Sequence, residues 1–299
     1  MAQMGIKRAP RRSSDLATGS RRSAESVAGA AQFACVLETS AEKPGNITPC
    51  HDFEDTSYED MLRSAIALGP ELGRAGGQSV GETVLAGVRA TRGVAGANTN
   101  LGIVLLLAPL ARAALLGGPL RDRVAEVLDG LTLDDARAAY TAILEAGAGG
   151  LDEPVEHDVH AAPTVALGDA MAAAAHRDSI AAEYTTYYAV TFERGLPALV
   201  RALDAGLQPR DATVELSLEL LAAVPDTLVA RKRGRRAAER VSAGAAGVLA
   251  AGGVRDVAGR AALEMFDASL RQDGNALNPG TTADLVTAVL FVALLEGLL

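Results

Sequence analysis

The chain has 299 residues and a formal net charge of −9, and hydrophobic side chains make up 49% of it. This length fits one large domain or two closely joined halves, with enough apolar surface for a core. The acidic balance excludes a general nucleic-acid binder, which needs a broad cationic face against the phosphate backbone. Two cysteines are too few for a disulfide scaffold or a cysteine metal site, so we expect free thiols and a cytoplasmic location.

The predicted elements are helices. Residues 1–22 are basic and lack an apolar period, so we expect a disordered tail followed by one helical domain over 23–299. The apolar runs at 101–111 and 285–295 are shorter than the roughly 20 residues that span a membrane, and are predicted to be buried helices. Further helices are expected at 23–39, from Tyr58 onward, and at 82–92, 119–128, 133–146, 178–194, 196–205, 211–223, 235–250, 255–271 and 282–297. The predicted fold class is all-α, a single multi-helix domain with buried apolar helices.

An acidic segment follows the Lys-Pro-Gly turn at residues 43–45. Ser57 and Asp60 have the spacing of a capping box, which assigns the last acids of this segment to the start of a helix. The residues before that cap have no local structural role, and their carboxylate oxygens suit Mg²⁺ shared with substrate phosphates. These residues are His51, Asp52, Glu54 and Asp55.

Two polar segments lead directly into the apolar helices. Asn98, Thr99 and Asn100 precede the first, and Asp284 lies at the start of the second. A helix N-terminus has unpaired amide hydrogens and a partial positive charge, so both segments are candidate anion sites. Helix capping alone is the alternative role for these four residues.

A basic run at residues 231–236 is a further candidate, in which we single out Arg231, Lys232 and Arg233. Arginine pairs well with phosphate oxygens, so the run could hold a polyphosphate, although such runs are more often a solvated face. The histidines at 157 and 160 lie between prolines without convincing metal spacing, and we do not expect zinc. Neither a Walker lysine motif nor a strand-linked glycine fingerprint is present.

Four segments, taken together and in order, resemble the triphosphoribosyl-dephospho-CoA synthase family: EKPGN with HDFEDTSYEDMLRSA, GANTNLGIVLLLAPL, PDTLVARKRG, and NPGTTADLVTAVLF. The resemblance implies an all-α transferase that moves the triphosphoribosyl group of ATP to the 2′-hydroxyl of 3′-dephospho-CoA and releases adenine. The chain departs from the family where Asn100-Leu101 replaces a typical His-Lys pair, and where Lys232-Arg233-Gly234 replaces Arg-Gly-Gly. We therefore expect a divergent member.

This chemistry needs a general base, a stabiliser for an oxocarbenium-like centre and a cationic site for the triphosphate. We expect Asp52 to be the base or the stabiliser, and His51 to position the substrate. Mg²⁺ would be held by Asp52, Glu54 and Asp55. The phosphate charge would be neutralised by Lys43, Arg231, Lys232 and Arg233.

The expected partners are ATP and dephospho-CoA or a similar acceptor, with a homodimer as an option and with no nucleic acid or membrane. Two other functions remain open. One is an ATP-dependent ribosyl transferase that makes another cofactor, for instance in one-carbon metabolism. The other is a helical protein that binds a nucleotide or CoA without catalysis, because the missing His-Lys pair removes charge from the loop that should meet phosphate.

Overall fold

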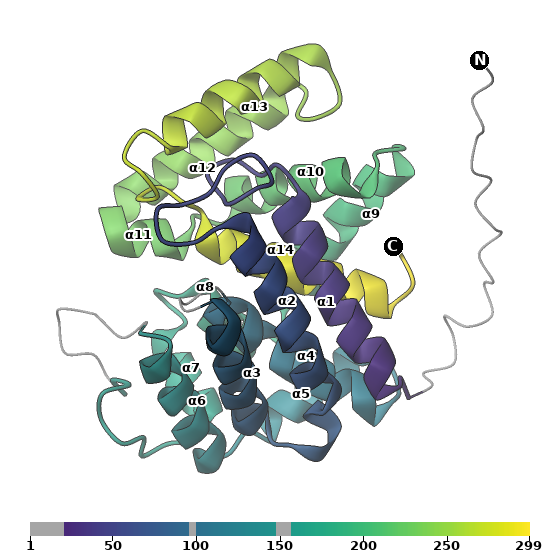
Figure 1. Cartoon of the computed structure of the whole chain (residues 1–299), viewed down its shortest axis with the longest axis vertical. Helices are drawn as coiled ribbons and strands as arrows, with labels where there is room; N and C mark the ends of the chain where they lie inside the picture. The colour runs from purple at the N-terminus through teal and green to yellow at the C-terminus, as the bar shows by residue number, and fades with distance from the viewer. Residues whose placement is uncertain (1–20, 96–99, 148–156) are drawn as a thin grey trace.

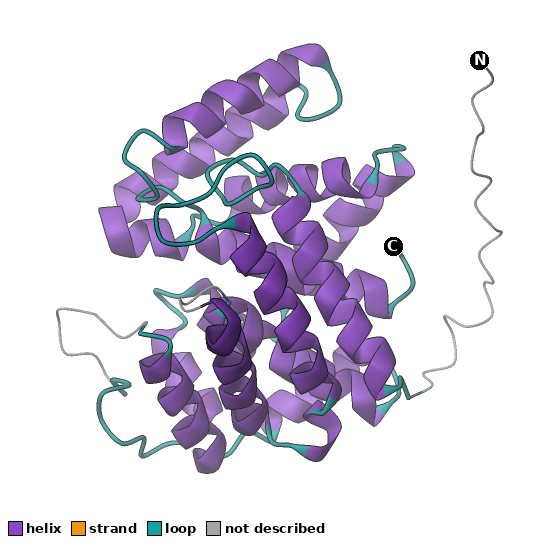
Figure 2. Cartoon of the chain, in the orientation of Figure 1, coloured by secondary structure: helices purple, strands orange, loops and turns teal. Residues whose placement is uncertain are grey.

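A computed structural model describes residues 21–95, 100–147 and 157–299. Helices dominate this part of the chain, and no strand occurs in it beyond an isolated bridge between Thr48 and His51 (Figures 1 and 2). The helices are α1 (Ala24–Ser40), α2 (Tyr58–Gly73), α3 (Val80–Ala95), α4 (Leu101–Leu116), α5 (Leu120–Asp129), α6 (Leu133–Glu145), α7 (Leu167–Ala174), α8 (Ser179–Thr185), α9 (Leu196–Asp204), α10 (Pro209–Ala223), α11 (Thr227–Arg233), α12 (Arg235–Ala250), α13 (Val257–Leu270) and α14 (Gly280–Leu295). The predicted all-α fold is confirmed.

Local capping explains where several helices begin. The side chain of Ser57 accepts from the amide of Asp60, whose carboxylate accepts from the amide of Ser57, so the predicted capping box starts α2. The same reciprocal pair joins Ser79 and Glu82 at the start of α3. These starts were predictable because each one depends on residues only three positions apart.

The core is built around α4 and α14, the two apolar helices. Both are buried along most of their length, and α14 lies in the middle of the molecule, in contact with α1, α4 and α10 (Figure 1). A second apolar cluster joins α10, α11, α12 and α13. Among the described helices, none has by itself the length and apolar character needed to cross a membrane, and only the sharply bent pair α4 and α5 has them jointly.

The structure differs from the predicted elements near residue 187. We expected one helix over 178–194, but α8 ends at Thr185 and a π-helical turn, Val190–Gly195, follows. Tyr187 and Tyr188 have positive φ angles of 51° and 60°, which a helix excludes. The buried carboxylate of Glu183 accepts from the amides of Val190 and Thr191 and so satisfies the interrupted backbone.

The N-terminal boundary is marked by Arg22. Its guanidinium donates to the carbonyl of Leu295 at 2.7 Å and to the carboxylate of Glu296 at 3.0 Å. The packed body therefore includes Arg22, two residues before α1, while residues 1–20 of the predicted tail lie outside the described residues. Both cysteines, Cys35 and Cys50, are free.

The connection from α1 to α2 lies against the C-terminal part of the chain. Gly45 donates its amide to the Asp267 carboxylate, and Arg271 donates to the carbonyl of Asn46. Gly45 has a φ of 73°, and an added Cβ would meet Leu270 at 3.0 Å, so glycine is required in this turn. These contacts place the turn after α1 against the C-terminal end of α13.

Candidate active site

A cavity of about 900 Å³ lies where several helices begin. Its walls come from the end of α1, the connection from α1 to α2, the first residues of α4, α8, α11 and α14, and the segment 157–178, with further residues from α2, α6 and α12. The amides at the starts of α4 and α14, both 16-residue helices, add a partial positive charge to this wall. The cavity is large enough for a nucleotide-sized ligand.

The floor of the cavity is acidic. Asp284, in the first turns of α14, lies in the cavity wall with Glu38 from α1 and Asp178 from the α8 N-cap. Burial, followed by the charges of Glu38, Asp226 and Asp178, raises the pKa of Asp284 well above its usual range. The amide of Ile103 opposes this shift by donating to the Asp284 carboxylate.

The contact between Asp284 and α4 is close. A Cβ added to Gly102 would lie 2.1 Å from a carboxylate oxygen of Asp284. Only glycine therefore lets the start of α4 approach this side chain. The start of α4 and Asp284 thus form one unit of the cavity wall.

Glu38 is paired with a buried lysine. The ammonium of Lys43 lies 2.8 Å from the Glu38 carboxylate and donates to the backbone carbonyl of Glu38 at 2.6 Å. The hydroxyl of Thr39 donates to the second carboxylate oxygen at 3.0 Å. Lys43 is fully buried, whereas Glu38 reaches the cavity wall, so the lysine supports the carboxylate from behind.

Asp226 holds two helix starts together behind the cavity. One carboxylate oxygen caps α11 by accepting from the amide of Val229, and the other accepts from the amide and hydroxyl of Thr282 at 2.7 and 2.8 Å. Burial raises the pKa of Asp226 in spite of these hydrogen bonds. Asp226 therefore fixes α11 against α14 and adds negative charge near Asp284.

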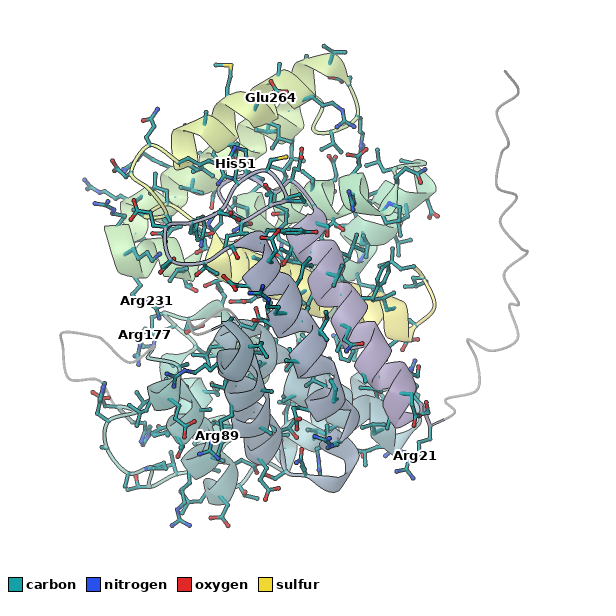
Figure 3. The ribbon with its side chains drawn as sticks, viewed as in Figure 1. Arg21, His51, Arg89, Arg177, Arg231 and Glu264 are labelled. Atoms are coloured by element: carbon teal, nitrogen blue, oxygen red, sulfur yellow. The ribbon has the colours of Figure 1, made fainter. Side chains whose placement is uncertain are left out.

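Cationic and imidazole side chains also line the cavity. Arg177 and Arg231 approach from different segments and lie near one another between the α8 and α11 regions (Figure 3). The other such side chains that line the cavity are His157, His160, His176 and Arg235. His160 is oriented by Asp158, whose carboxylate lies 2.8 Å from its Nδ1. The lining of the cavity therefore includes both acidic and basic side chains, a combination suited to a sugar carrying several phosphates.

Two of the predicted binding residues, Arg231 and Asp284, line the cavity. Lys43 does not, because its ammonium is engaged by Glu38, which corrects the expected phosphate contact. Lys232 donates to the carbonyl of Asn275, and Arg233 faces Asp273 at 3.7 Å, so these two cations point to the 273–275 turn instead. The alternative role of Asp284 as a helix cap is not observed, because α14 starts without a side-chain cap.

The predicted segment 98–100 is described only at its last residue. Asn98 and Thr99 lie outside the described residues. Asn100 precedes α4, is 2% exposed and does not cap the helix. Its neighbour Leu101 lines the cavity, so the replacement of a typical family lysine places an apolar side chain in the wall.

His51, Asp52, Glu54 and Asp55 do not themselves line the cavity, although Phe53 and Thr56 of the same segment do. His51 is exposed on the connection between α1 and α2, away from Arg177 and Arg231 (Figure 3). Asp52 is also exposed, and its carboxylate accepts from the amide of Tyr58 at 2.7 Å. Within the described ranges, no three His, Cys, Asp or Glu side chains are grouped to hold a metal, so Asp52, Glu54 and Asp55 do not meet. As they stand, these three do not fit a shared Mg²⁺ ion.

Sequence reasoning missed Glu38, Asp178, Arg177 and the wall histidines as cavity residues. One signal was available for Glu38, because an acid at the end of an apolar helix, five residues before a lysine, can form a buried pair. The other residues become neighbours only through the packing of α4, α8 and α14.

Comparisons with known proteins identify the family of this chain. The family model described as ATP:dephospho-CoA triphosphoribosyl transferase matches residues 24–299. A Pseudomonas paraeruginosa protein named a probable 2-(5′′-triphosphoribosyl)-3′-dephosphocoenzyme-A synthase is 31% identical over 72% of this chain and 65% of its own length. The chain thus matches slightly less than two thirds of that relative.

Two further matches have corresponding names. The Klebsiella pneumoniae 2-(5′′-triphosphoribosyl)-3′-dephosphocoenzyme-A synthase is 36% identical over 34% of this chain and 36% of its own length. A crystal structure from Archaeoglobus fulgidus, assigned as a triphosphoribosyl-dephospho-CoA synthase, aligns with a TM-score of 0.63 and 27% identity over 79% of this chain and 99% of its own. The chain belongs to the ATP:dephospho-CoA triphosphoribosyl transferase family.

Proposed function

We propose that this protein transfers the triphosphoribosyl group of ATP to the 2′-hydroxyl of 3′-dephospho-CoA and releases adenine. The family match supports the reaction, and the cavity supports it chemically. The observation that carries the proposal is that two acids, Glu38 and Asp284, line the same cavity as Arg177 and Arg231. A triphosphate needs the cationic wall, and a ribose carbon that becomes positive needs the acidic floor.

The reaction exchanges one bond at C1′ of the ATP ribose for another. The bond to N9 of adenine breaks as the bond to the acceptor oxygen forms. Arg177, Arg231 and Arg235 would hold phosphate oxygens, with help from the amides at the starts of α4 and α14. This orientation would place C1′ near Glu38, whose negative charge would stabilise an oxocarbenium-like centre.

We also propose that ATP binds as its magnesium complex. The proposed location of the enzyme is the cytoplasm, and its proposed oligomeric state is a homodimer. Magnesium is reluctant to lose water and is usually bound through few carboxylates and substrate phosphates. The triphosphate itself would therefore supply most of its ligands. Chelation by excess EDTA should abolish adenine release, and gel filtration with light scattering measures the subunit number.

The acceptor has one competitor that an observation favours. Leu101 lines the cavity where family members typically carry a lysine, so the wall offers less positive charge. A related hydroxyl acceptor with fewer phosphates than dephospho-CoA would suit this change. We therefore expect the acceptor to be the variable part of the reaction and ATP to be the fixed part.

Adenine release, measured by chromatography, tests the function. The purified protein is incubated with ATP and Mg²⁺ alone, with dephospho-CoA, and with other hydroxyl-bearing cofactors. Adenine and a mass-matched conjugate should appear with dephospho-CoA. A conjugate with another acceptor only would support the competitor, and ATP binding with no adenine from any acceptor would support a binding protein.

A matched pair of variants tests the phosphate wall. Arg231→Ala should weaken ATP binding by about 10-fold to 100-fold, since a charge-assisted hydrogen bond contributes roughly 1.5–3 kcal/mol. Arg233→Ala removes a neighbouring cation that faces Asp273 instead, and should change the dissociation constant less than about twofold. Calorimetry at fixed salt measures the dissociation constant for ATP of both variants. Equal weakening by the two substitutions would mean that the basic residues 231–236 act only through their general positive charge.

A further inference from the structure

Building on the proposed transferase function, we infer that Asp284 and Glu38 divide the acid–base work: Asp284 gives a proton to the departing adenine, and Glu38 takes the proton of the acceptor hydroxyl. Both side chains line the same cavity, one from α14 and one from α1. Their surroundings differ in a way that favours different protonation states. The difference between two carboxylates in one site is the usual basis for assigning acid and base.

Asp284 has the environment of a proton donor. It is packed against the backbone of Gly102 and is surrounded by three further carboxylates, those of Glu38, Asp178 and Asp226. The groups that face it are therefore acids from α1 and from the N-caps of α8 and α11, opposed by the amide of Ile103 on α4. Burial and these like charges raise the pKa of Asp284, which favours its protonated form.

Glu38 has the environment of a proton acceptor. Lys43 supplies a full positive charge at 2.8 Å, and the Thr39 hydroxyl donates to the other oxygen. These two partners leave both carboxylate oxygens of Glu38 hydrogen-bonded and place a counter-charge beside them. Lys43 lies behind Glu38, so it is a positioning residue that acts through the carboxylate.

The proposed step balances in atoms and charge. The electron pair of the C1′–N9 bond passes to adenine, which gains the Asp284 proton and leaves neutral. The acceptor oxygen forms the new bond to C1′ as its proton passes to Glu38. Asp284 is then ionised and Glu38 is protonated, and exchange with water restores both before the next turnover.

The test varies the leaving group. Asp284→Asn keeps the shape and can still accept from Ile103, but it carries no acidic proton. With ATP and dephospho-CoA, the rate constant for this variant should fall by about 10²–10⁴-fold, the range for general acid catalysis. With 4-nitrophenyl ribofuranoside 5′-triphosphate, whose leaving group needs no proton, the rate should stay within about threefold of the unmodified enzyme.

Glu38→Gln is the contrasting variant. It removes the base but leaves the acid, so transfer from both donors should fall by about 10²-fold or more. Equal losses for both donors in Asp284→Asn would overturn the acid assignment, and so would full adenine release by that variant. Full activity of Glu38→Gln would overturn the base assignment.

The unmodified enzyme provides a second measurement that does not depend on the folding of a variant. Because the acid must be protonated, kcat/KM with ATP should fall as the pH rises through the pKa of Asp284, whereas the nitrophenyl donor should not show this decrease. A high-pH decrease of the same size for both donors would contradict the inference. If the unmodified enzyme releases no adenine with any acceptor, the proposed function fails instead, which separates the two outcomes.

Discussion

At the scale of single residues, Lys43 shows how one contact changes the role suggested by a motif. In the sequence it belongs to a polar Lys-Pro-Gly turn, which is typical of a solvent-exposed cation. In the structure its ammonium is fully buried between the carboxylate and the carbonyl of Glu38. The charge of Lys43 therefore serves the acidic floor and is not available to a phosphate.

Replacing Lys43 gives the first prediction. Lys43→Met removes the buried cation and leaves the Glu38 carboxylate buried without its counter-charge. This change should lower the free energy of unfolding by about 3–5 kcal/mol. Lys232→Met, at an exposed lysine whose ammonium reaches the carbonyl of Asn275, should cost less than about 0.5 kcal/mol. Urea unfolding measures both, and the double change with Glu38→Gln should recover part of the loss. Equal stability of the two single variants would contradict a buried pair.

The second prediction concerns Asp52, whose catalytic role stays a prediction from sequence. Its carboxylate accepts from the amide of Tyr58, the first residue of α2, and it lies outside the cavity wall. Asp52→Ala should therefore cost about 0.5–2 kcal/mol of stability, as the loss of a cap does, with adenine release within about threefold of normal. A loss of 100-fold or more in adenine release at unchanged stability would instead restore Asp52 to the catalytic site.

At the scale of elements, helix starts were more predictable than helix interruptions. The start of α2 at Tyr58 followed from Ser57 and Asp60, because a capping box is encoded within four residues. The break after α8 was not predictable, because it depends on Glu183 accepting amides from Val190 and Thr191. Short helices such as α7 (Leu167–Ala174) were also missed, because eight residues are too few to show a clear helical spacing of apolar side chains.

The third prediction tests the junction of α4 and α14. Gly102→Ala adds a methyl group that would lie 2.1 Å from the Asp284 carboxylate, so α4 and α14 must separate. We expect a net loss of about 1–3 kcal/mol and a strong decrease in adenine release. Gly93→Ala in α3 is the matched control, because nothing lies within 4 Å of its added Cβ. That variant should gain about 0.5–1 kcal/mol. Thermal unfolding and adenine release are measured for both variants. Equal stability and equal activity of the two would show that Asp284 does not pack closely against Gly102.

At the scale of the whole molecule, the sequence supported the fold class better than the site. Apolar residues at helical spacing require helices that pack around a core, whatever the arrangement of the helix ends. The all-α class could therefore be predicted from the sequence. The cavity instead needs Glu38, Arg177 and Asp284 to meet across more than 240 positions of sequence. Such a meeting is decided by helix packing, and local pattern carries no information about it.

The fourth prediction concerns the N-terminal boundary. Removal of residues 1–20 should leave the melting temperature and ATP binding unchanged, because this segment is basic and lacks an apolar period. Arg22→Ala should cost about 1–3 kcal/mol, since it removes charge-assisted bonds to Leu295 and Glu296 at the end of α14. Calorimetric unfolding of the two proteins distinguishes these expectations. A large loss on truncation would mean that the first 20 residues contribute to the packed body.

The last prediction follows from the position of the cavity between segments that are distant in sequence. A ligand that bridges Arg177 and Arg231 must stabilise both walls together, because opening either wall releases it. At 100 times its dissociation constant, ATP should slow hydrogen exchange by up to about 100-fold in the segment 157–178 and at the start of α14. The exposed face of α13 does not line the cavity. Its amide hydrogens that exchange through local unfolding should therefore exchange at the same rate with and without ATP. Mass spectrometry of peptides from the full chain measures all three regions in one experiment. Protection of α13 without protection of 157–178 would show that ATP binds elsewhere. If ATP protects 157–178 in the unmodified protein but not in Arg231→Ala, both walls contact the same bound nucleotide.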